Sequence, residues 1–238
     1  MNKEQTITGV IRGTGACVPE RILDNKEIAG FVDTSDEWIR ERTGVRRRRI
    51  AEKETTVSMA CEAGRQAVEE AGISPGEIDM ILVATGSPDQ IFPCTACRVQ
   101  EALGADGAVG FDLNAACSGF LFAYNTAQAY IASGIYRTVL VIGSESISRL
   151  VDWTDRGTCI LFGDGAGAVL LQAAEGKTYR PIAHSDGSGG AALTGPGVRN
   201  RIRSIDKDDR EAKTEYITMN GKDVFQFAVR KVPQVIQE

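Results

Sequence analysis

One short segment carries the sharpest chemical feature of the sequence. In Asp112-Leu113-Asn114-Ala115-Ala116-Cys117-Ser118-Gly119-Phe120, a cysteine stands between an expected buried strand and the start of an apolar helix. A helix N-terminus stabilises a thiolate, which attacks carbonyl carbons, and its backbone N–H groups can hold an oxyanion. The small neighbours Ala115, Ala116 and Gly119 would let a substrate approach. Cys117 is therefore either a nucleophile or a small apolar side chain of the core.

Three other residues, two cysteines and a histidine, have side chains that could bind a metal or act in catalysis. Cys94 and Cys97 have the spacing of metal ligands, but the sequence holds no second cysteine pair or histidine cluster to complete a zinc site. One face of a helix is the simpler interpretation of this pair. His184 is the only histidine, and nothing in its position ties it to Cys117. A structural or surface role is favoured for it over a general base.

Two further patterns allow more than one interpretation. Gly163-Asp164-Gly165-Ala166-Gly167-Ala168 imitates a dinucleotide-binding loop, but the following Val169-Leu170-Leu171 is typical of a strand, whereas phosphate binding needs a helix start. Close backbone packing is the favoured reason for these glycines. The cluster Arg46-Arg47-Arg48-Arg49, together with Arg40 and Arg42, is either a site for a phosphorylated or acidic partner or a solvated charge run.

The elements that must position these residues alternate between strands and helices. Strands are expected at 6–15, 80–85, 108–113 and 138–142, and helices at 36–43, 55–71, 95–103 and 117–133. Ser35 is the expected cap of the first helix, and Gly44, Gly72 and Gly104 mark helix ends. The alternation predicts a layered α/β fold.

The expected helix at 117–133 has no charged residue, so we expect it to be central rather than on the surface. Residues 187–209 are rich in glycine and then in charge, which is typical of an exposed connection. A strand at 216–219 and a helix at 222–238 would follow, with Pro233 as a kink.

Composition narrows the class of protein. The 238 residues, 42% hydrophobic and 25% charged, are enough for one or two globular domains and exclude a disordered chain. The net charge of −5 argues against nucleic acid as the main partner. No membrane span and no export signal is visible, so six free thiols in a reducing cytoplasm are expected.

Taken together, these stretches resemble the β-ketoacyl-acyl carrier protein synthase III family. The resemblance runs nearly from end to end and rests on segments 33–39, 42–44, 112–120, 155–157 and 162–168. It implies a thiolase-like layered αβα fold with an incomplete second half: residues 1–175 form the N-terminal half with the nucleophile, and 176–238 begin a truncated C-terminal half.

The resemblance also implies roles for individual residues. Cys117 would be the acyl-accepting nucleophile, Trp38 and Arg156 would sandwich the adenine of coenzyme A, and Arg42 would meet its phosphate. Phe92 would reach across a homodimer to close the partner's acyl pocket. Three further residues would line the substrate site: Phe162 in the acyl pocket, and Asn220 and Gly221 near the coenzyme tunnel.

The implied reaction joins acyl-coenzyme A to malonyl-acyl carrier protein by decarboxylative condensation through an acyl-cysteine, with no metal or other cofactor. In the family, the enolate is stabilised by a His and an Asn in motifs of the form His-Gln-Ala-Asn and Gly-Asn-Thr-Ser, and neither motif is present here. We therefore expect this chain to be part of a longer protein. The alternatives are a related acyl-thioester synthase of a secondary pathway and an inactive subunit that pairs with a complete synthase.

Overall fold

The computed structural model describes residues 6–197 and 215–238. The described chain forms two compact units. Unit 1 contains the described residues up to 23 together with 47–147 and 163–181, and unit 2 contains 24–46, 148–162 and the described residues from 182 onward. The predicted division at residue 175 concerns the halves of a duplication and stays a prediction.

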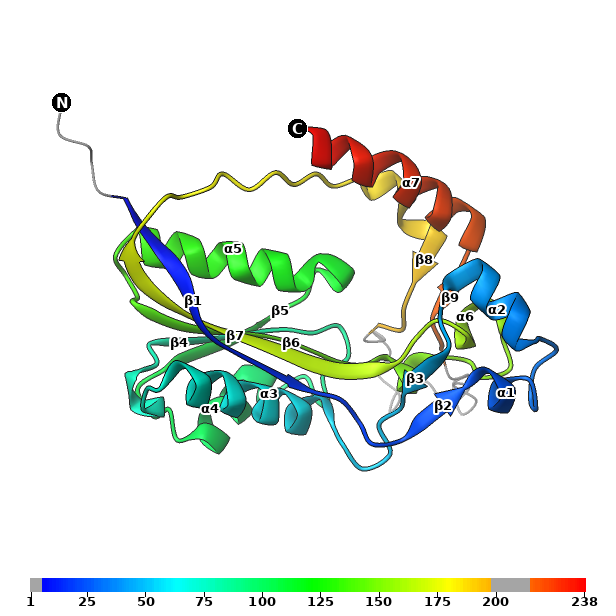
Figure 1. The fold of residues 1–238 in the computed structure, drawn as a ribbon, viewed down its shortest axis with the longest axis horizontal. Coiled ribbons are helices and arrows are strands. Elements are labelled where there is room, and N and C mark those ends of the chain that lie inside the picture. Colours follow the sequence, from blue (N-terminus) through cyan, green and yellow to red (C-terminus); the bar gives the residue numbers. More distant parts are fainter. Residues whose placement is uncertain (1–5, 198–214) are drawn as a thin grey trace, which may run out of the picture. The chain divides into compact units, whose positions relative to one another are not determined.

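Unit 1 is built on a five-stranded mixed sheet in the order β1-β7-β6-β4-β5 (Figure 1). Its strands are β1 (Ile7–Cys17), β7 (Asp164–Glu175), β6 (Thr138–Ser146), β4 (Met80–Ala84) and β5 (Val109–Leu113). β6, β4 and β5 are parallel, whereas β1 pairs antiparallel with β7 and β7 antiparallel with β6. The carboxyl ends of the three parallel strands therefore meet at one edge of the sheet.

Helices cover both faces of this sheet. α3 (Thr56–Ala71) and α4 (Thr95–Leu103) lie on one face and α5 (Gly119–Ala132) on the other, as Figure 1 shows. β4 is buried along its whole length because Ile81 and Val83 face the first layer while Met80 and Leu82 face α5. The prediction of a layered αβα fold with a strand buried on both faces is confirmed.

The contact of β1 with α3 requires glycine. A Cβ atom on Gly13 would lie 2.0 Å from the carbonyl oxygen of Ala67, and one on Gly15 would lie 2.0 Å from that of Ala63. These distances are far below van der Waals contact, so the helix packs directly on the strand backbone only because both positions lack a side chain.

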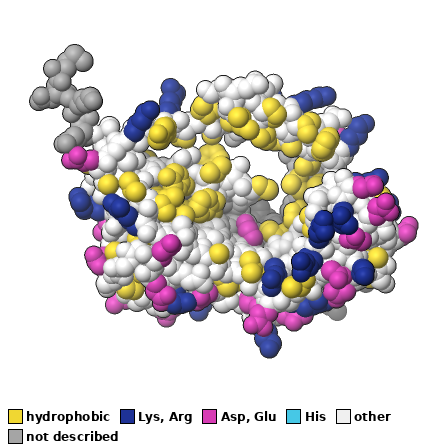
Figure 2. Space-filling view, viewed as in Figure 1, with side chains coloured by type: hydrophobic (Ala, Val, Ile, Leu, Met, Phe, Trp, Pro, Cys, Tyr) yellow, Lys and Arg dark blue, Asp and Glu magenta, His cyan; other side chains and the backbone are white. Residues whose placement is uncertain are grey.

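The prediction that the charge-free helix is central is wrong for the described residues. α5 buries one stripe, formed by Gly119, Ala123, Ala127 and Ile131, against the sheet. Leu121 is 63% exposed and Phe122 38% exposed, and apolar side chains gather over α5 in Figure 2. The four-residue spacing of small residues decides which side packs, and a lack of charge on the other side does not by itself bury it.

The glycine-rich segment at 163–168 enters β7 rather than a phosphate-binding turn, as the sequence favoured. A Cβ on Gly163 would lie 3.1 Å from the carbonyl oxygen of Arg49, which confirms close backbone packing there.

The basic cluster is not one solvated run, because β3 (Arg47–Arg49) alternates: Arg48 is buried while its two neighbours are exposed. β3 pairs with β2 (Ile22–Asp24).

Unit 2 combines one long helix with several short elements. Its helices are α1 (Asn25–Ile28), α2 (Asp36–Thr43), α6 (Arg156–Cys159) and α7 (Gly221–Gln237), and a two-stranded sheet joins β8 (Leu193–Thr194) to β9 (Thr218–Met219). Four 3-10 turns complete the described chain: η1 (Pro75–Glu77), η2 (Ala116–Ser118), η3 (Ile147–Leu150) and η4 (Gly187–Ala192).

Several sequence predictions concern this unit. Ser35 caps α2 through its side chain and Gly44 ends it in the left-handed conformation, as predicted. Pro233 lies inside α7. The predicted connection at 187–209 begins with η4, and its part from residue 198 onward lies outside the described residues. No helix in the described ranges is long and apolar enough to cross a membrane.

Candidate active site

Cys117 lies just beyond the carboxyl end of β5, in η2, two residues before α5 begins. It is exposed and is not paired in a disulfide. Ligands of α/β sheets bind at the carboxyl ends of parallel strands, where loops present side chains to a common crevice. The predicted arrangement of a thiol between a strand and a helix N-terminus is therefore present, and in the described chain this thiol is on the surface rather than in the core.

The turn that presents Cys117 has an unusual backbone. Ala116 has a φ of +46°, the only positive φ among the non-glycine residues that the structure describes. The side-chain oxygen of Asn114 accepts the N–H of Ala116 at 3.1 Å. Such a conformation costs an L-residue about 1–2 kcal/mol, so neighbouring contacts must hold it. A left-handed alanine has no sequence signal, and this feature was not predicted.

A carboxylate on the neighbouring strand was also missed from the sequence. Glu145, near the end of β6, accepts the N–H of Gly86 at 2.8 Å, and the Ser87 hydroxyl hydrogen-bonds to the same carboxylate. Ser87 in turn accepts the N–H of Ser146 at 2.8 Å. The only available signal was a charge at the end of an apolar strand. These bonds tie the ends of β4 and β6 together at the edge from which the Cys117 turn also leaves.

A second carboxylate fixes the end of β5. The two oxygens of Asp112 accept the N–H groups of Thr95 and Ala96, each at 2.8 Å, and so satisfy the start of α4.

In the segment before this helix, Phe92 is 83% exposed and Ile91 is 65% exposed. The structure thus places the predicted dimer residue Phe92 in an apolar surface segment of unit 1.

Unit 2 gathers three of the predicted coenzyme residues. The guanidinium carbon of Arg42 lies 4.2 Å from the centroid of the Trp38 ring, and that of Arg156 lies 4.8 Å from it. Arg42 follows Trp38 by one helical turn of α2. Arg156 opens α6 and donates to the carbonyl oxygen of Asp33 at 2.8 Å. Both contacts are within the range of cation–π attraction.

The spacing over Trp38 sets a condition for the predicted adenine sandwich. A planar base between an indole and a guanidinium needs roughly 7 Å between the two, which is two van der Waals contacts of about 3.5 Å. Arg156 lies at 4.8 Å. Its side chain is half exposed and would have to move outward by roughly 2 Å to admit a base.

Near this cluster one polar group lacks a partner. The hydroxyl oxygen of Thr34 is buried and makes no hydrogen bond within the described part of the chain. Thr34 directly precedes Ser35, the cap of α2. A buried hydroxyl of this kind costs free energy unless a ligand or water completes it. Residue type alone could not single out this threonine from the sequence.

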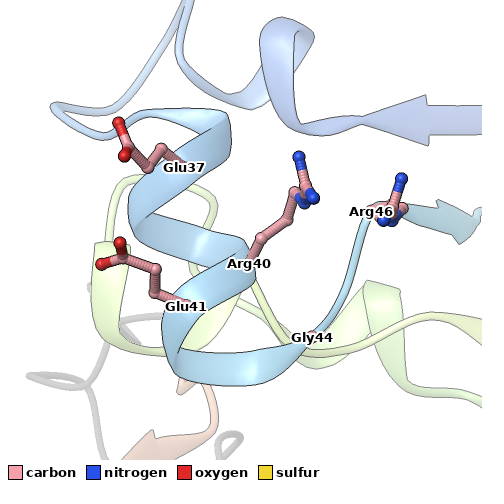
Figure 3. Close-up of a pocket in the computed structure, with 5 residues that line it drawn as sticks. All are labelled: Glu37, Arg40, Glu41, Gly44 and Arg46. Carbon is pink, nitrogen blue, oxygen red and sulfur yellow. The ribbon is translucent and has the colours of Figure 1, made fainter.

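A separate hollow of about 550 Å³ lies along another side of α2, lined by Glu37, Arg40, Glu41, Gly44 and Arg46 (Figure 3). The two glutamates point away from the two arginines in this view. Arg40 pairs with Asp36 at 3.3 Å. The hydrogen bond from Asn25 and the pairing with Arg40 hold the pKa of Asp36 below its usual value. None of the predicted coenzyme residues lines this hollow.

The remaining predicted residues have less distinctive surroundings. Phe162 is half-buried. Asn220 caps α7, accepting the N–H of Asp223 at 3.3 Å, and Gly221 is the first residue of that helix. His184 is exposed and contacts Glu238 at 2.8 Å, which agrees with a surface role. Across residues 6–197 and 215–238, no three His, Cys, Asp or Glu residues are grouped to hold a metal.

The αβα layers of unit 1 and the cysteine turn at the carboxyl edge of its sheet define a protein with a thiolase-like fold, and known proteins narrow this class. A family model described as 3-oxoacyl-[acyl-carrier-protein (ACP)] synthase III matches residues 111–193. A β-ketoacyl-[acyl-carrier-protein] synthase III of Clostridium acetobutylicum is 47% identical over 233 residues, which are 96% of this chain and 71% of that relative. The chain belongs to the β-ketoacyl-[acyl-carrier-protein] synthase III family.

Solved structures agree with this assignment. The 3-oxoacyl-[acyl-carrier-protein] synthase III of Aquifex aeolicus matches with a TM-score of 0.84 and 43% identity, over 96% of this chain and 70% of that one. The priming β-ketosynthase from the R1128 polyketide biosynthetic pathway matches with a TM-score of 0.88 and 35% identity, over 99% of this chain and 70% of that one. The predicted family and fold are confirmed.

Proposed function

We propose that the protein is an acyltransferase of type II fatty-acid synthesis, the initiating condensing enzyme that joins acyl-coenzyme A to malonyl-acyl carrier protein. The observation that carries this proposal is the exposed Cys117 on its left-handed turn, in a chain 47% identical to a β-ketoacyl-[acyl-carrier-protein] synthase III over 96% of its length. The thiol is presented outward at the edge of the sheet where substrates of such folds bind.

In the first step, the Cys117 thiolate attacks the thioester carbonyl of acyl-coenzyme A. The carbonyl oxygen becomes an oxyanion, which backbone N–H groups at the start of α5 can stabilise. Collapse of the intermediate breaks the bond to the coenzyme sulfur, which leaves as a thiolate and takes a proton. The acyl group is then held on Cys117, and one difficult condensation has been split into two easier steps.

In the second step, malonyl-acyl carrier protein loses carbon dioxide. The electron pair of the broken bond becomes an enolate, whose carbon attacks the acyl-cysteine carbonyl and returns the thiolate to Cys117. Neither of these two reaction steps uses a metal or an organic cofactor. Acyl-coenzyme A takes part as a substrate. The partner protein in the reaction is acyl carrier protein, and we place the reaction in the cytoplasm.

The coenzyme is assigned to unit 2. Trp38 offers an aromatic face for the adenine, Arg156 would close over it, and Arg42, which is exposed, would meet the phosphate. The unpartnered hydroxyl of Thr34 supports a ligand beside α2. Phe162 is assigned to the acyl pocket, and Asn220 with Gly221 to the wall of the coenzyme tunnel.

A homodimer is proposed through unit 1. Support comes from β5, which is an edge strand of the sheet, and from the exposed Phe92, three residues before Thr95, whose N–H bonds to Asp112 of β5. An unpaired edge and an exposed apolar segment are typical of a protein interface. Sedimentation analysis should give a dimer for the wild type and a monomer for Phe92→Asp, with Phe225→Asp on α7 as the matched exposed control; a dimer unchanged by Phe92→Asp would contradict this assignment.

The acyl-transfer step has a direct test. On incubation with acetyl-coenzyme A, intact mass spectrometry should show one acetyl group on the wild type and none on Cys117→Ala. Cys159→Ala, which removes a buried thiol, is the control and should acylate normally. Acetylation of Cys117→Ala at the wild-type rate, or failure of the folded wild type to acylate, would overturn the proposal.

A related synthase of a secondary pathway is the second candidate. The observation that favours it is the match at TM-score 0.88 to the priming β-ketosynthase of a polyketide pathway. Competition among acyl-coenzyme A substrates of different chain length separates the two functions. Preference for acetyl-coenzyme A supports the fatty-acid enzyme, whereas preference for a longer or branched acyl group supports the pathway-specific synthase.

A further inference from the structure

A pair of cysteines at the start of α4 is not used by the proposed reaction. Cys94 is the residue that caps α4 and has an extended backbone, and Cys97 lies within the first turn. Their sulfur atoms are 3.4 Å apart. Cys97 is exposed and Cys94 is half-buried. The two thiols are thus in contact, and Cys97 is exposed in the single chain. Because its sulfur contacts Gly110 of β5, the edge at which the homodimer is proposed, exchange at this site takes place on the monomer.

The surroundings of the pair favour redox chemistry over metal binding. The Cys97 sulfur also contacts the carbonyl oxygen of Gly110 at 3.9 Å. Within the described ranges, no third His, Cys, Asp or Glu completes a metal site with these sulfurs. Two cysteines separated by two residues at a helix start are a typical arrangement for thiol–disulfide exchange.

The backbone between the two cysteines is fixed by hydrogen bonds to a carboxylate. The N–H groups of Thr95 and Ala96, the two intervening residues, both donate to the carboxylate of Asp112 at 2.8 Å. Thr95 and Ala96 are also buried. The sulfur atoms must approach from 3.4 Å to about 2.05 Å, and rotation of side chains can supply this while the backbone stays in place.

We propose that Cys94 and Cys97 form a reversible dithiol–disulfide site that exchanges with small-molecule disulfides. The exposed Cys97 thiolate attacks one sulfur of the disulfide, breaks its S–S bond and releases one thiolate, which takes a proton. The Cys94 thiolate then attacks the mixed disulfide on Cys97 and releases the second. The protein loses two protons and two electrons, and the small disulfide is reduced to two thiols.

The rate of this exchange depends on pH. The contact with Cys94 and partial burial raise the pKa of Cys97 above its usual value, and the Asp112 carboxylate acts in the same direction. Less thiolate is therefore present at neutral pH, and exchange should accelerate as the pH rises towards the pKa of Cys97.

The experiment uses the whole chain with Cys117→Ala, so that the proposed nucleophile does not react, and with Phe92→Asp, the variant expected to be monomeric. The protein is equilibrated with oxidised and reduced glutathione, alkylated and cut with trypsin. Cleavage after Arg65 and Arg98 releases the peptide 66–98, which contains Cys94 and Cys97 and no other cysteine. Its mass directly reports the state of the pair.

Under excess oxidised glutathione, the peptide should lack two hydrogen atoms and carry no alkyl group, and dithiothreitol should restore two alkylated thiols. Cys94→Ser should stop at a glutathione adduct on Cys97, whereas Cys61→Ser, a half-buried control on α3, should leave the disulfide unchanged. The proposal would be overturned if the protein that retains both Cys94 and Cys97 showed two alkylated thiols, or a persistent glutathione adduct, under excess oxidised glutathione. The test does not depend on acyl transfer, because Cys117 is absent from it.

Discussion

The segment around Cys117 and the cluster around Trp38 are held in place by different interactions. In unit 1, the Cys117 turn is shaped by its backbone, with a left-handed Ala116 and a hydrogen bond from its N–H to the Asn114 side chain. In unit 2, two arginine side chains lie over one indole ring. The first arrangement is a strained backbone conformation, whereas the second is made of partly exposed, charged side chains.

This difference suggests a division of labour between the two regions. Backbone geometry positions a reacting atom within tenths of an ångström, and small displacements there reduce rates. Exposed stacking and charge contribute affinity, typically about 0.5–1 kcal/mol for each cation–π contact. Substitutions in unit 1 should therefore change the rate of acylation, and substitutions in unit 2 should change the concentration of coenzyme that is needed.

The largest effect is expected at Ala116. A β-branched residue strongly disfavours a positive φ, so Ala116→Val should force the turn to change and lower the acylation rate of Cys117 by roughly 10- to 100-fold. The free energy of unfolding should fall by about 2 kcal/mol. Stopped-flow acylation and urea denaturation measure the two quantities.

Ala116→Gly is the matched control for this prediction. Glycine adopts a positive φ without strain, so this variant should acylate at close to the wild-type rate. Equal rates for the valine and glycine variants would mean that the left-handed backbone does not position Cys117, and the contrast between the two regions would fail.

The next effect concerns Trp38. Removing a stacking platform by Trp38→Ala should weaken coenzyme A binding by roughly tenfold, because stacking on an aromatic ring contributes about 1–3 kcal/mol per base. The maximal acylation rate at saturating acyl-coenzyme A should change little. Trp38→Phe keeps an aromatic face and should lose less affinity. A fall in the maximal rate with unchanged binding would place Trp38 with the rate-determining region instead.

The sequence predicted the elements of unit 1 better than the surroundings of its functional residues. The bounds of α3 and α4 follow from hydrophobic period and from glycine at 72 and 104, which are local signals. The exposure of Leu121 and Phe122 on α5 depends on which side of that helix meets the sheet, and local composition does not encode this.

The surroundings of Cys117 were also only partly predictable from local sequence. Cys117 was located from its neighbours in the chain, because a thiol between a strand and a helix is a local pattern. The links from Gly86 to Glu145 and from Thr95 to Asp112 join residues far apart in sequence. Only the pairing of β4 with β5 and β6 brings these groups together, so no local pattern could predict them.

Salt offers a sharper test of the contrast. Raising the salt concentration from about 0.05 M to about 0.5 M shortens the screening length and should weaken coenzyme A binding several-fold through Arg42 and Arg156. Acylation of Cys117 by a small uncharged thioester, which lacks the nucleotide, should be nearly unchanged. If salt reduced coenzyme A binding and acylation by the small thioester by the same factor, the salt dependence would not come from Arg42 and Arg156.

The smallest effect is a pH response confined to α2. The Asn25 side chain donates to Asp36 at 2.8 Å, and with Arg40 it holds the pKa of Asp36 below its ordinary value. The folded pKa is lowered, so this stabilisation of α2 is present above the ordinary carboxyl pKa and is lost as the pH falls through the lowered value. Trp38 lies two residues further along the same helix and reports its state.

In a Trp153→Phe background, Trp38 is the remaining tryptophan, and its fluorescence should change on acidification with a midpoint below the ordinary pKa of an aspartate. Asp36→Asn should remove this transition, whereas Glu41→Gln on the same helix should keep it. Acylation of Cys117 by the small thioester, measured after return to neutral pH, should recover fully. A transition that persists in Asp36→Asn would show that α2 responds to another group, because the carboxylate that Asn25 and Arg40 hold is then absent.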